Sequence, residues 1–272
     1  MENSQNAQAN KEQKNVHSII SVNIKNLNMK KVFVLLYGFI SYLAFFGTIL
    51  YAIGFVGNII APKTIDSAPQ TSLLNAILIN ASLLLLFALQ HSIMARPAFK
   101  KWWTRIVPEQ LERSTYVLLA SLCLILMMWQ WQPIGGIVWS IENETVKTIL
   151  FVTYIIGWAI VFVATFLINH FDLFGLRQVW FYFLGKPYMQ LPFRLPLFYK
   201  FVRHPLYLGF LIAFWSTPVM TIAHLLFAVL TTGYILTAIQ FEEKDLVNHF
   251  GEKYRNYKKT KPMIIPFTKR RA

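Results

Sequence analysis

Long apolar stretches alternate with short polar connections along most of this chain. The stretches cover residues 32–57, 72–95, 115–134, 146–169 and 206–241. A helix needs about 20 apolar residues to cross a bilayer, and the last stretch is nearly twice as long, so we interpret it as two helices. Pro218 marks the expected break, because proline interrupts a helix interior. The pattern therefore predicts an all-α fold, a polytopic membrane bundle of about six transmembrane segments whose last two form a helical hairpin.

The polar ends of the chain set the expected domain boundaries. Residues 1–31 are rich in Asn, Gln and Lys and hold too few apolar residues to form a core, so we expect a mobile polar tail. Residues 32–266 are expected to form a single membrane-embedded domain. Residues 267–272 would then be a short basic tail.

The basic excess follows the expected topology of the helices. The chain has 26 Lys and Arg against 12 Asp and Glu, a formal net charge of +14. If six helices alternate in direction, only Lys63 and Lys147 fall in connections on the outer side. Lys and Arg concentrate in cytoplasmic connections, so both termini are expected in the cytoplasm. The charge is thus explained by topology and by contact with membrane lipid, which argues against nucleic acid as a partner.

A basic motif stands where the last apolar stretch begins. Arg203 and His204 precede Pro205, and proline suits the first helical position because its missing N–H costs nothing there. The free N–H groups of the next turn would form an anion site beside Arg203, suited to a carboxylate or a phosphate. The alternative is an interfacial anchor, because arginine near the end of a membrane helix commonly extends to lipid headgroups.

The two ends of the final hairpin are expected to meet. The chain crosses the membrane and returns, which brings Arg203 and His204 to the same end as Glu242 and Glu243. Adjacent helical residues project about 100° apart, so one carboxylate can face a pocket while the other faces solvent or lipid headgroups. Which of the two faces the pocket stays open.

Aromatic side chains would complete this pocket. Tyr254 and Tyr257 follow at i, i+3 spacing, on one face of a helix. An anion site, a carboxylate for a ribose and aromatic walls for a base suit a zwitterionic nucleoside ligand. Its cationic centre would be attracted by the aromatic faces.

Two further histidines lie where apolar stretches end. His170 and Asp172 are followed by Arg177, and a histidine beside a carboxylate can serve as an oriented general base. The same residues could equally form a structural ion network under the helix ends. His91 closes an earlier stretch, where a histidine faces protein or a water-filled cavity more readily than lipid. It is either a catalytic base or an interfacial histidine bonded to a neighbouring helix.

The cysteine and histidine spacing does not indicate a metal site. The chain has one cysteine and six histidines, without the HxxxH or HxxHH spacing of membrane metal oxidases. We therefore expect no bound metal.

Motifs in the second half of the chain resemble a known superfamily. The residues concerned are Arg203, His204, Pro205, Tyr207, Gly209, Glu242, Glu243, Phe250, Gly251, Tyr254 and Tyr257. They resemble the isoprenylcysteine carboxyl methyltransferase and phospholipid methyltransferase superfamily of small membrane enzymes that use S-adenosylmethionine. Residues 35–266 resemble more closely its nurim-like branch, which contains bacterial methanethiol S-methyltransferases, through the stretches 90–97 and 170–178.

The resemblance implies methyl transfer in a bacterial inner membrane and roles for particular residues. Those implied to hold S-adenosylmethionine, the methyl-donating co-substrate, are Arg203, His204, Tyr207, Gly209, Glu242 or Glu243, Tyr254 and Tyr257. The sulfonium methyl would pass to methanethiol and give dimethyl sulfide. Direct SN2 transfer needs a deprotonated thiol held at attack distance. His170 oriented by Asp172, or His91, would take the thiol proton, and Arg177 would stabilise the anion.

Three other functions remain open at this stage. A methyltransferase of this kind could act on a larger lipid or prenylated substrate, although short outer connections leave little room for a headgroup. Sterol-reductase-like hydride enzymes share the hairpin, although the chain has no Gly-rich dinucleotide fingerprint. The third alternative is a non-catalytic membrane scaffold of the nurim type. The sequence does not indicate thiol selectivity or oligomeric state.

Overall fold

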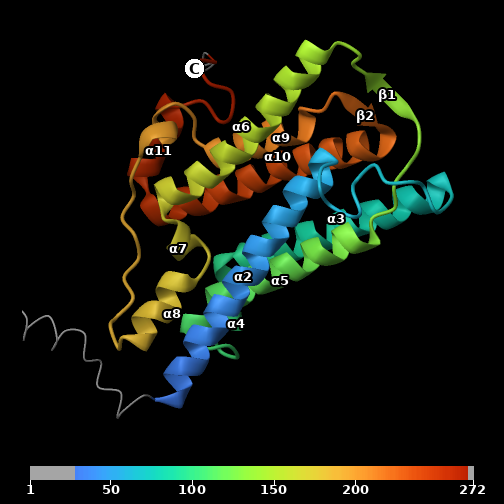
Figure 1. The fold of residues 1–272 in the computed structure, drawn as a ribbon. Helices are drawn as coiled ribbons and strands as arrows, with labels where there is room; N and C mark the ends of the chain where they lie inside the picture. Colours follow the sequence, from blue (N-terminus) through green and yellow to red (C-terminus); the bar gives the residue numbers. More distant parts are fainter. Residues whose placement is uncertain (1–27, 269–272) are drawn as a thin grey trace, which may run out of the picture.

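A computed structural model describes residues 28–268 and shows an almost wholly helical protein (Figure 1). The long helices are α2 (Met29–Gly57), α3 (Leu73–Ala95), α5 (Glu109–Gln130), α6 (Glu144–Ile168) and α10 (Ile222–Phe250). The shorter ones are α4 (Pro97–Trp103), α7 (His170–Leu173), α8 (Leu176–Phe183), α9 (Pro205–Trp215), α11 (Glu252–Thr260) and the 3-10 turn η2 (Leu197–Lys200). The strands β1 (Ile137–Ser140) and β2 (Val219–Thr221) form one antiparallel pair. The all-α prediction is confirmed.

Five helices, α2, α3, α5, α6 and α10, are long and apolar enough to cross a membrane, so the chain is a multi-pass membrane protein. The sixth apolar helix, α9, has only 11 residues, or about 16 Å against a hydrocarbon core of about 30 Å. The predicted break around Pro218 is present, because α9 ends at Trp215 and α10 begins at Ile222. Between them the extended chain pairs through β2 with β1, which satisfies its backbone groups.

Successive long helices alternate in direction, so the bundle has two distinct ends (Figure 1). At one end α3, α6 and α10 finish and α5 and α9 begin; it is called the site end here. The β1–β2 pair lies at the opposite end. α10 has 29 residues, about 43 Å, and about 30 Å separates Ile222 from Glu242. The two glutamates therefore lie about one bilayer core away from the β pair.

Several predicted helix boundaries differ from the structure, among them those of α2 and α5. α2 begins at Met29 rather than 32, because the Asn28 side chain caps the helix by accepting from the Lys30 N–H at 3.0 Å. α5 begins at Glu109 and ends at Gln130 rather than covering 115–134, with the chain turning out of the helix before Pro133. The predictions for the two tails concern residues 1–27 and 269–272, which lie outside the described part of the chain.

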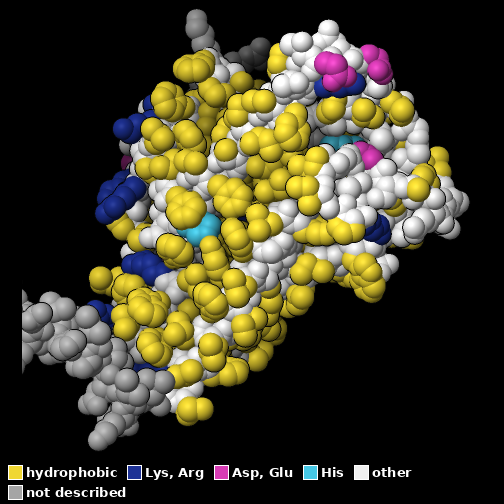
Figure 2. All heavy atoms as spheres, in the orientation of Figure 1, with side chains coloured by type: hydrophobic (Ala, Val, Ile, Leu, Met, Phe, Trp, Pro, Cys, Tyr) yellow, Lys and Arg dark blue, Asp and Glu magenta, His cyan; other side chains and the backbone are white. Residues whose placement is uncertain are grey.

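A buried aromatic core joins the helices toward the β-pair end. It includes Phe55, Trp131, Trp158, Phe214 and Phe227, contributed by α2, the chain after α5, α6, α9 and α10. Many large apolar side chains remain exposed around the bundle, and Figure 2 shows them covering most of the visible face. An apolar outer surface over an apolar core suits a lipid environment.

Two glycines bring α6 and α9 into backbone contact. A Cβ on Gly209 would lie 2.7 Å from the Gly157 carbonyl oxygen, and a Cβ on Gly157 would lie 2.7 Å from the Ala213 nitrogen. Small residues permit this close approach between membrane helices. The start of α9 is therefore fixed against α6.

A third glycine fixes α7 and α8 against α5. Gly175 has φ +88°, and a Cβ there would lie 2.6 Å from the Ser114 hydroxyl oxygen. A left-handed backbone in such close contact requires glycine. The turn places the residues after α6 beside the start of α5.

Candidate functional site

The start of α9 is built as its sequence predicts. Pro205 occupies the first helical position and His204 precedes it as the cap. The backbone N–H of Arg203 donates to the Pro262 carbonyl at 3.0 Å, and that of His204 donates to the Met263 carbonyl at 3.1 Å. The chain that follows α11 therefore lies along the entry to α9.

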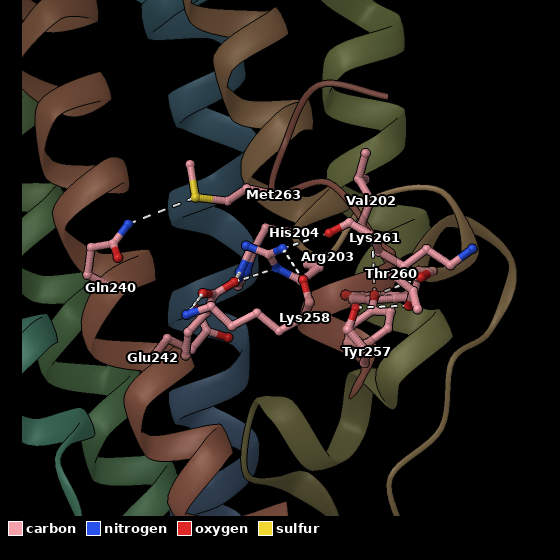
Figure 3. A network of polar contacts seen from close by, with 12 residues as sticks. Val202, Arg203, His204, Gln240, Glu242, Tyr257, Lys258, Thr260, Lys261 and Met263 are labelled. Carbon is pink, nitrogen blue, oxygen red and sulfur yellow. Dashed lines mark hydrogen bonds and ion pairs between the residues drawn. The ribbon is translucent and has the colours of Figure 1, made fainter. Parts of the chain in front are cut away.

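A buried ion network joins α9, α10 and α11 around Glu243 (Figure 3). Arg203 Nε donates to Glu243 Oε1 at 2.5 Å, and Lys258 Nζ lies 2.7 Å from Glu243 Oε2. His204 Nε2 lies 3.2 Å from Oε1 of the same carboxylate. The Glu243 side chain is only 2% exposed, so it makes its contacts with protein groups.

The Arg203 guanidinium also anchors the end of α11. Its Nη1 donates to the Lys258 and Lys261 carbonyls at 3.1 and 2.6 Å. These bonds satisfy carbonyls that a helix leaves free at its C-terminus. Arg203 is itself buried, so it ties three elements together and does not extend to lipid headgroups.

Glu242 differs from its neighbour in what it contacts. Its Oε2 accepts from the Tyr207 hydroxyl at 3.0 Å, and His204 Nδ1 lies 3.9 Å away. The Glu242 side chain is 42% exposed. The structure therefore shows Glu243 inside the protein and Glu242 at the accessible edge, the distinction that the sequence left open.

The aromatic residues of α11 are covered by the connection after α8. Phe193 packs against Tyr254 and Tyr257, with ring centroids 6.0 and 5.8 Å away. The Tyr257 hydroxyl donates to the Tyr199 carbonyl at 2.6 Å. Burial raises the pKa of both α11 tyrosines above their ordinary value, so both hydroxyls stay protonated at neutral pH.

His91 lies on α3 near the site end, and its contact is with Tyr116 of α5. The Tyr116 hydroxyl is 3.0 Å from Nδ1 and 2.9 Å from Nε2 of the imidazole. Phe87, one turn earlier, stacks on the imidazole with centroids 5.2 Å apart. The contact matches the expected bond to a neighbouring helix, and its catalytic role stays a prediction.

His170 is bonded on both sides of its ring. Its Nε2 is 2.9 Å from the Tyr42 hydroxyl of α2, and its Nδ1 is 2.8 Å from the Thr165 hydroxyl of α6. The Phe166 ring stacks on it at 4.2 Å. The residue is 3% exposed, and burial lowers its pKa below the ordinary value of 6.5. Such a histidine is held neutral between helices.

The pairing of His170 with Asp172 that the sequence suggested is wrong. Asp172 Oδ1 instead accepts from Arg177 Nη1 at 2.9 Å and from the Tyr188 hydroxyl at 3.0 Å. Residues two apart on a helical turn project to different sides, so His170 and Asp172 face different partners. Burial, and then the Asp172 charge, raise the pKa of Tyr188. The Asp172–Arg177 pair thus ties α7 to α8, and the Tyr188 hydroxyl adds the connection after α8, as the structural alternative expected.

Gly209 was implied to belong to the cofactor pocket, and the structure places it at the α6–α9 contact against Gly157. Its place in a pocket stays a prediction. The other implied residues, Arg203, His204, Tyr207, Glu242 and Glu243, are brought together at the site end.

Sequence reasoning missed Tyr116, Arg113, Tyr234 and Lys258. Arg113 and Tyr116 stand at i, i+3 on α5, and the guanidinium carbon lies 4.9 Å from the centroid of the Tyr116 ring. The Tyr234 hydroxyl of α10 accepts from the Ser92 hydroxyl at 3.3 Å. The i, i+3 spacing was a readable signal, but the partners of these residues lie on other helices.

Comparisons with known proteins give close relatives. The chain is 56% identical over 244 residues to the methanethiol S-methyltransferase of Crocosphaera subtropica, covering 90% of this chain and 96% of that protein. It is 49% identical over 242 residues to the methanethiol S-methyltransferase of Mycobacterium tuberculosis, covering 89% and 99%. It is 34% identical over 184 residues to nurim of Bos taurus, covering 64% and 70%. No family model and no solved structure matches the chain.

Proposed function

The chain belongs to the methanethiol S-methyltransferase family, and we propose that it transfers the methyl group of S-adenosylmethionine to methanethiol, with dimethyl sulfide as product. The family resemblance predicted from the sequence motifs is confirmed. The observation that supports the proposed site is the meeting of the α9 start with the α10 end. There an accessible carboxylate, Glu242, stands beside the closed network of Glu243.

The residues at the site end fit a methyl donor with a cationic sulfur and an amino-acid group. Glu242 retains an exposed side chain and accepts one hydrogen bond, from Tyr207. It would take an ammonium or a ribose hydroxyl of the donor. Among the described residues, Nη2 of Arg203 has no hydrogen-bond partner, whereas Nε and Nη1 are engaged. That nitrogen would take a carboxylate.

Glu243 has a different part in this proposal. Its carboxylate is enclosed by Arg203, His204 and Lys258, so it would position Arg203 and His204 without touching the donor. Tyr254 and Tyr257 would stand behind Phe193 as an aromatic wall. Aromatic faces suit both an adenine ring and a sulfonium cation.

The acceptor thiol must lose its proton, because the thiolate is the reactive nucleophile. S-adenosylmethionine would supply a methyl group on a positively charged sulfur. Of the two candidate bases, His91 is favoured, because both ring nitrogens of His170 are already bonded. His91 would accept the thiol proton on a ring nitrogen while the thiol sulfur forms its new bond to carbon. Arg177 is paired with Asp172 at 2.9 Å, so its charge is already countered and its role beside the thiolate stays a prediction.

The proposed setting is a bacterial inner membrane with the site end and both termini on the cytoplasmic side. The support is the concentration of Lys and Arg at that end, with Lys63 and Lys147 as the exceptions. In this orientation the site would lie at the cytoplasmic boundary of the bilayer, about one hydrocarbon core away from the β1–β2 pair. A small apolar thiol could then enter from the membrane, and a water-soluble donor from the cytoplasm.

The test is product formation by membranes that contain the protein. They would be supplied with S-adenosylmethionine and methanethiol, and dimethyl sulfide in the headspace would be measured. We expect product from the native protein and a loss of donor binding in Glu242→Gln. Methyl label recovered in lipid would indicate a lipid methyltransferase, and no transfer from a folded protein would indicate a scaffold. Either result would overturn the proposal.

A further inference from the structure

The His91 imidazole has an unused hydrogen-bonding position. Within the described chain its polar contact is one hydroxyl, that of Tyr116, which lies within 3.0 Å of both ring nitrogens. In a neutral imidazole one nitrogen carries a hydrogen and the other a lone pair, and the Tyr116 oxygen can accept from the ring N–H. The nitrogen with the lone pair then has no other hydrogen-bond partner among the described residues, and the residue is partly exposed. His170 has no such freedom.

Tyr116 is itself held in place from two directions. The Arg113 guanidinium carbon lies 4.9 Å from the centroid of its ring, and Arg113 Nε donates to the Leu173 carbonyl at 2.6 Å. Arg113 is therefore fixed to the turn at the end of α7. Tyr116 is buried, and its contact with His91 links α5 to α3.

The His91–Tyr116 pair lies on helices that reach the same end of the bundle as Glu242. Phe87 contacts both the His91 ring and the Tyr234 ring, at 5.2 and 6.1 Å between centroids. Ser92, next to His91, donates to the Tyr234 hydroxyl at 3.3 Å, and Arg96 at the end of α3 pairs with Asp245, three residues after Glu242, at 2.9 Å. The end of α3 that carries the proposed base is therefore held against the end of α10 that carries the proposed donor site.

We propose that Tyr116 is a positioning residue, whose hydroxyl oxygen accepts from the N–H of the His91 ring and so leaves the lone pair of the other ring nitrogen to accept the proton of a small thiol. The inference rests on the proposed function and extends it. In the step, the thiol S–H bond breaks and the proton moves to His91. The sulfur electron pair forms the new S–C bond, and the donor sulfur keeps the pair of the bond that breaks. Arg113 acts one step further away, by fixing the Tyr116 ring.

The test compares two matched variants, Tyr116→Phe and Tyr42→Phe. Each substitution removes a tyrosine hydroxyl that contacts a histidine. The histidine is His91 in the first variant and His170 in the second. We expect kcat for methanethiol to fall about tenfold in Tyr116→Phe, the factor for one lost hydrogen bond, with an unchanged KM for S-adenosylmethionine. Tyr42→Phe should keep the native kcat per folded molecule. An equal fall in both variants would overturn the inference.

A more acidic acceptor separates positioning from a structural effect. With 2,2,2-trifluoroethanethiol, whose proton is lost more easily than that of methanethiol, the defect of Tyr116→Phe should shrink by several-fold. A defect of the same size with both thiols would show that the hydroxyl does not act on proton removal. Failure of the native protein to methylate any thiol would instead overturn the proposed function.

A readout without turnover tests the contact itself. Diethyl pyrocarbonate modifies free imidazole nitrogens, and mass spectrometry would follow His91 and His170 in the same sample. In Tyr116→Phe the modification of His91 should become several-fold faster, whereas that of His170 should not change. An unchanged rate at His91 would show that Tyr116 does not hold the ring, whatever the activity of the variant.

Discussion

The regions around His91 and His170 show how two similar histidines come to differ. Both lie near the site end of the bundle, His91 in the last turns of α3 and His170 just after α6, and both touch a tyrosine of a neighbouring helix, Tyr116 for His91 and Tyr42 for His170. His170 has a second partner, the Thr165 hydroxyl, and is 3% exposed. A histidine bonded on both nitrogens stabilises the packing of helices, whereas one with a free nitrogen can take part in chemistry.

The same contrast recurs at the paired glutamates. The Glu243 side chain is 2% exposed and is surrounded by three basic groups, whereas that of Glu242 is 42% exposed beside Tyr207. In each pair, one group is fully engaged by the protein and the other is accessible. A polar side chain with an unused hydrogen-bonding group is therefore a better candidate for binding or catalysis than one whose groups are all bonded, even when the two residues are of the same type.

The largest expected effect is on turnover at His91. His91→Gln should lower kcat about 100- to 10,000-fold, the usual range for losing a general base, with little change in melting temperature. His170→Gln should keep turnover per folded molecule and lose about 1–3 kcal/mol of stability, because its partners are left unpaired. Dimethyl sulfide release and thermal melting in detergent measure the two effects. Similar turnover losses in both variants would remove the distinction.

Glu243→Gln should reduce stability by about 3–5 kcal/mol, because it leaves buried Arg203 without its countercharge. Glu242→Gln is the matched control. It should change the melting temperature little, because its side chain is partly exposed, but should weaken binding of S-adenosylhomocysteine measured by calorimetry. If Glu242→Gln destabilised the protein more than Glu243→Gln, the assignment of the two carboxylates would be reversed.

Gly209→Ala should reduce stability by about 1–3 kcal/mol, because the new methyl group would meet the backbone of α6. Gly233→Ala on α10 provides the control, since nothing lies within 4 Å of a Cβ there. Alanine at that position should be neutral or stabilising by up to about 1 kcal/mol. Thermal melting of the two variants gives the comparison, and equal melting temperatures would argue against a tight α6–α9 crossing.

The smallest effect is a pH dependence of stability from His170. Its folded-state pKa lies below 6.5 because of burial, so on acidification the unfolded chain takes up a proton before the folded one does. Its stabilising contribution is thus complete above pH 6.5 and is lost as the pH falls toward the folded pKa, by at most about 1.4 kcal/mol per pH unit. Melting temperatures between pH 7 and 5 should fall less steeply in His170→Gln. Identical slopes would show that His170 does not titrate in this way.

Much of the fold could be predicted from apolar periodicity. All five long helices and the break near Pro218 follow from the length of apolar runs and from proline chemistry. The length of α9 could not be predicted in this way. It stops at Trp215, where the chain leaves the helix to pair with a strand 80 residues away in sequence. A long-range strand partner leaves no local signal.

The candidate site was predictable only in part. The out-and-back path of the hairpin was enough to bring Arg203 toward Glu242 and Glu243, and the structure places them together. The sequence did not identify Tyr116, because a tyrosine in an apolar helix gives no sign of the helix that it will face. It also suggested a His170–Asp172 pair that the structure does not form.

By itself the sequence determined the class of this protein, a membrane helix bundle, and the motifs that place it in its family. These depend on the length of apolar runs and on residues close together in the chain, which any fold of the same sequence keeps. Only the tertiary structure decided which histidine and which glutamate are accessible. Whether a polar group is engaged or free depends on partners contributed by other helices, so it is settled by packing rather than by position in the chain.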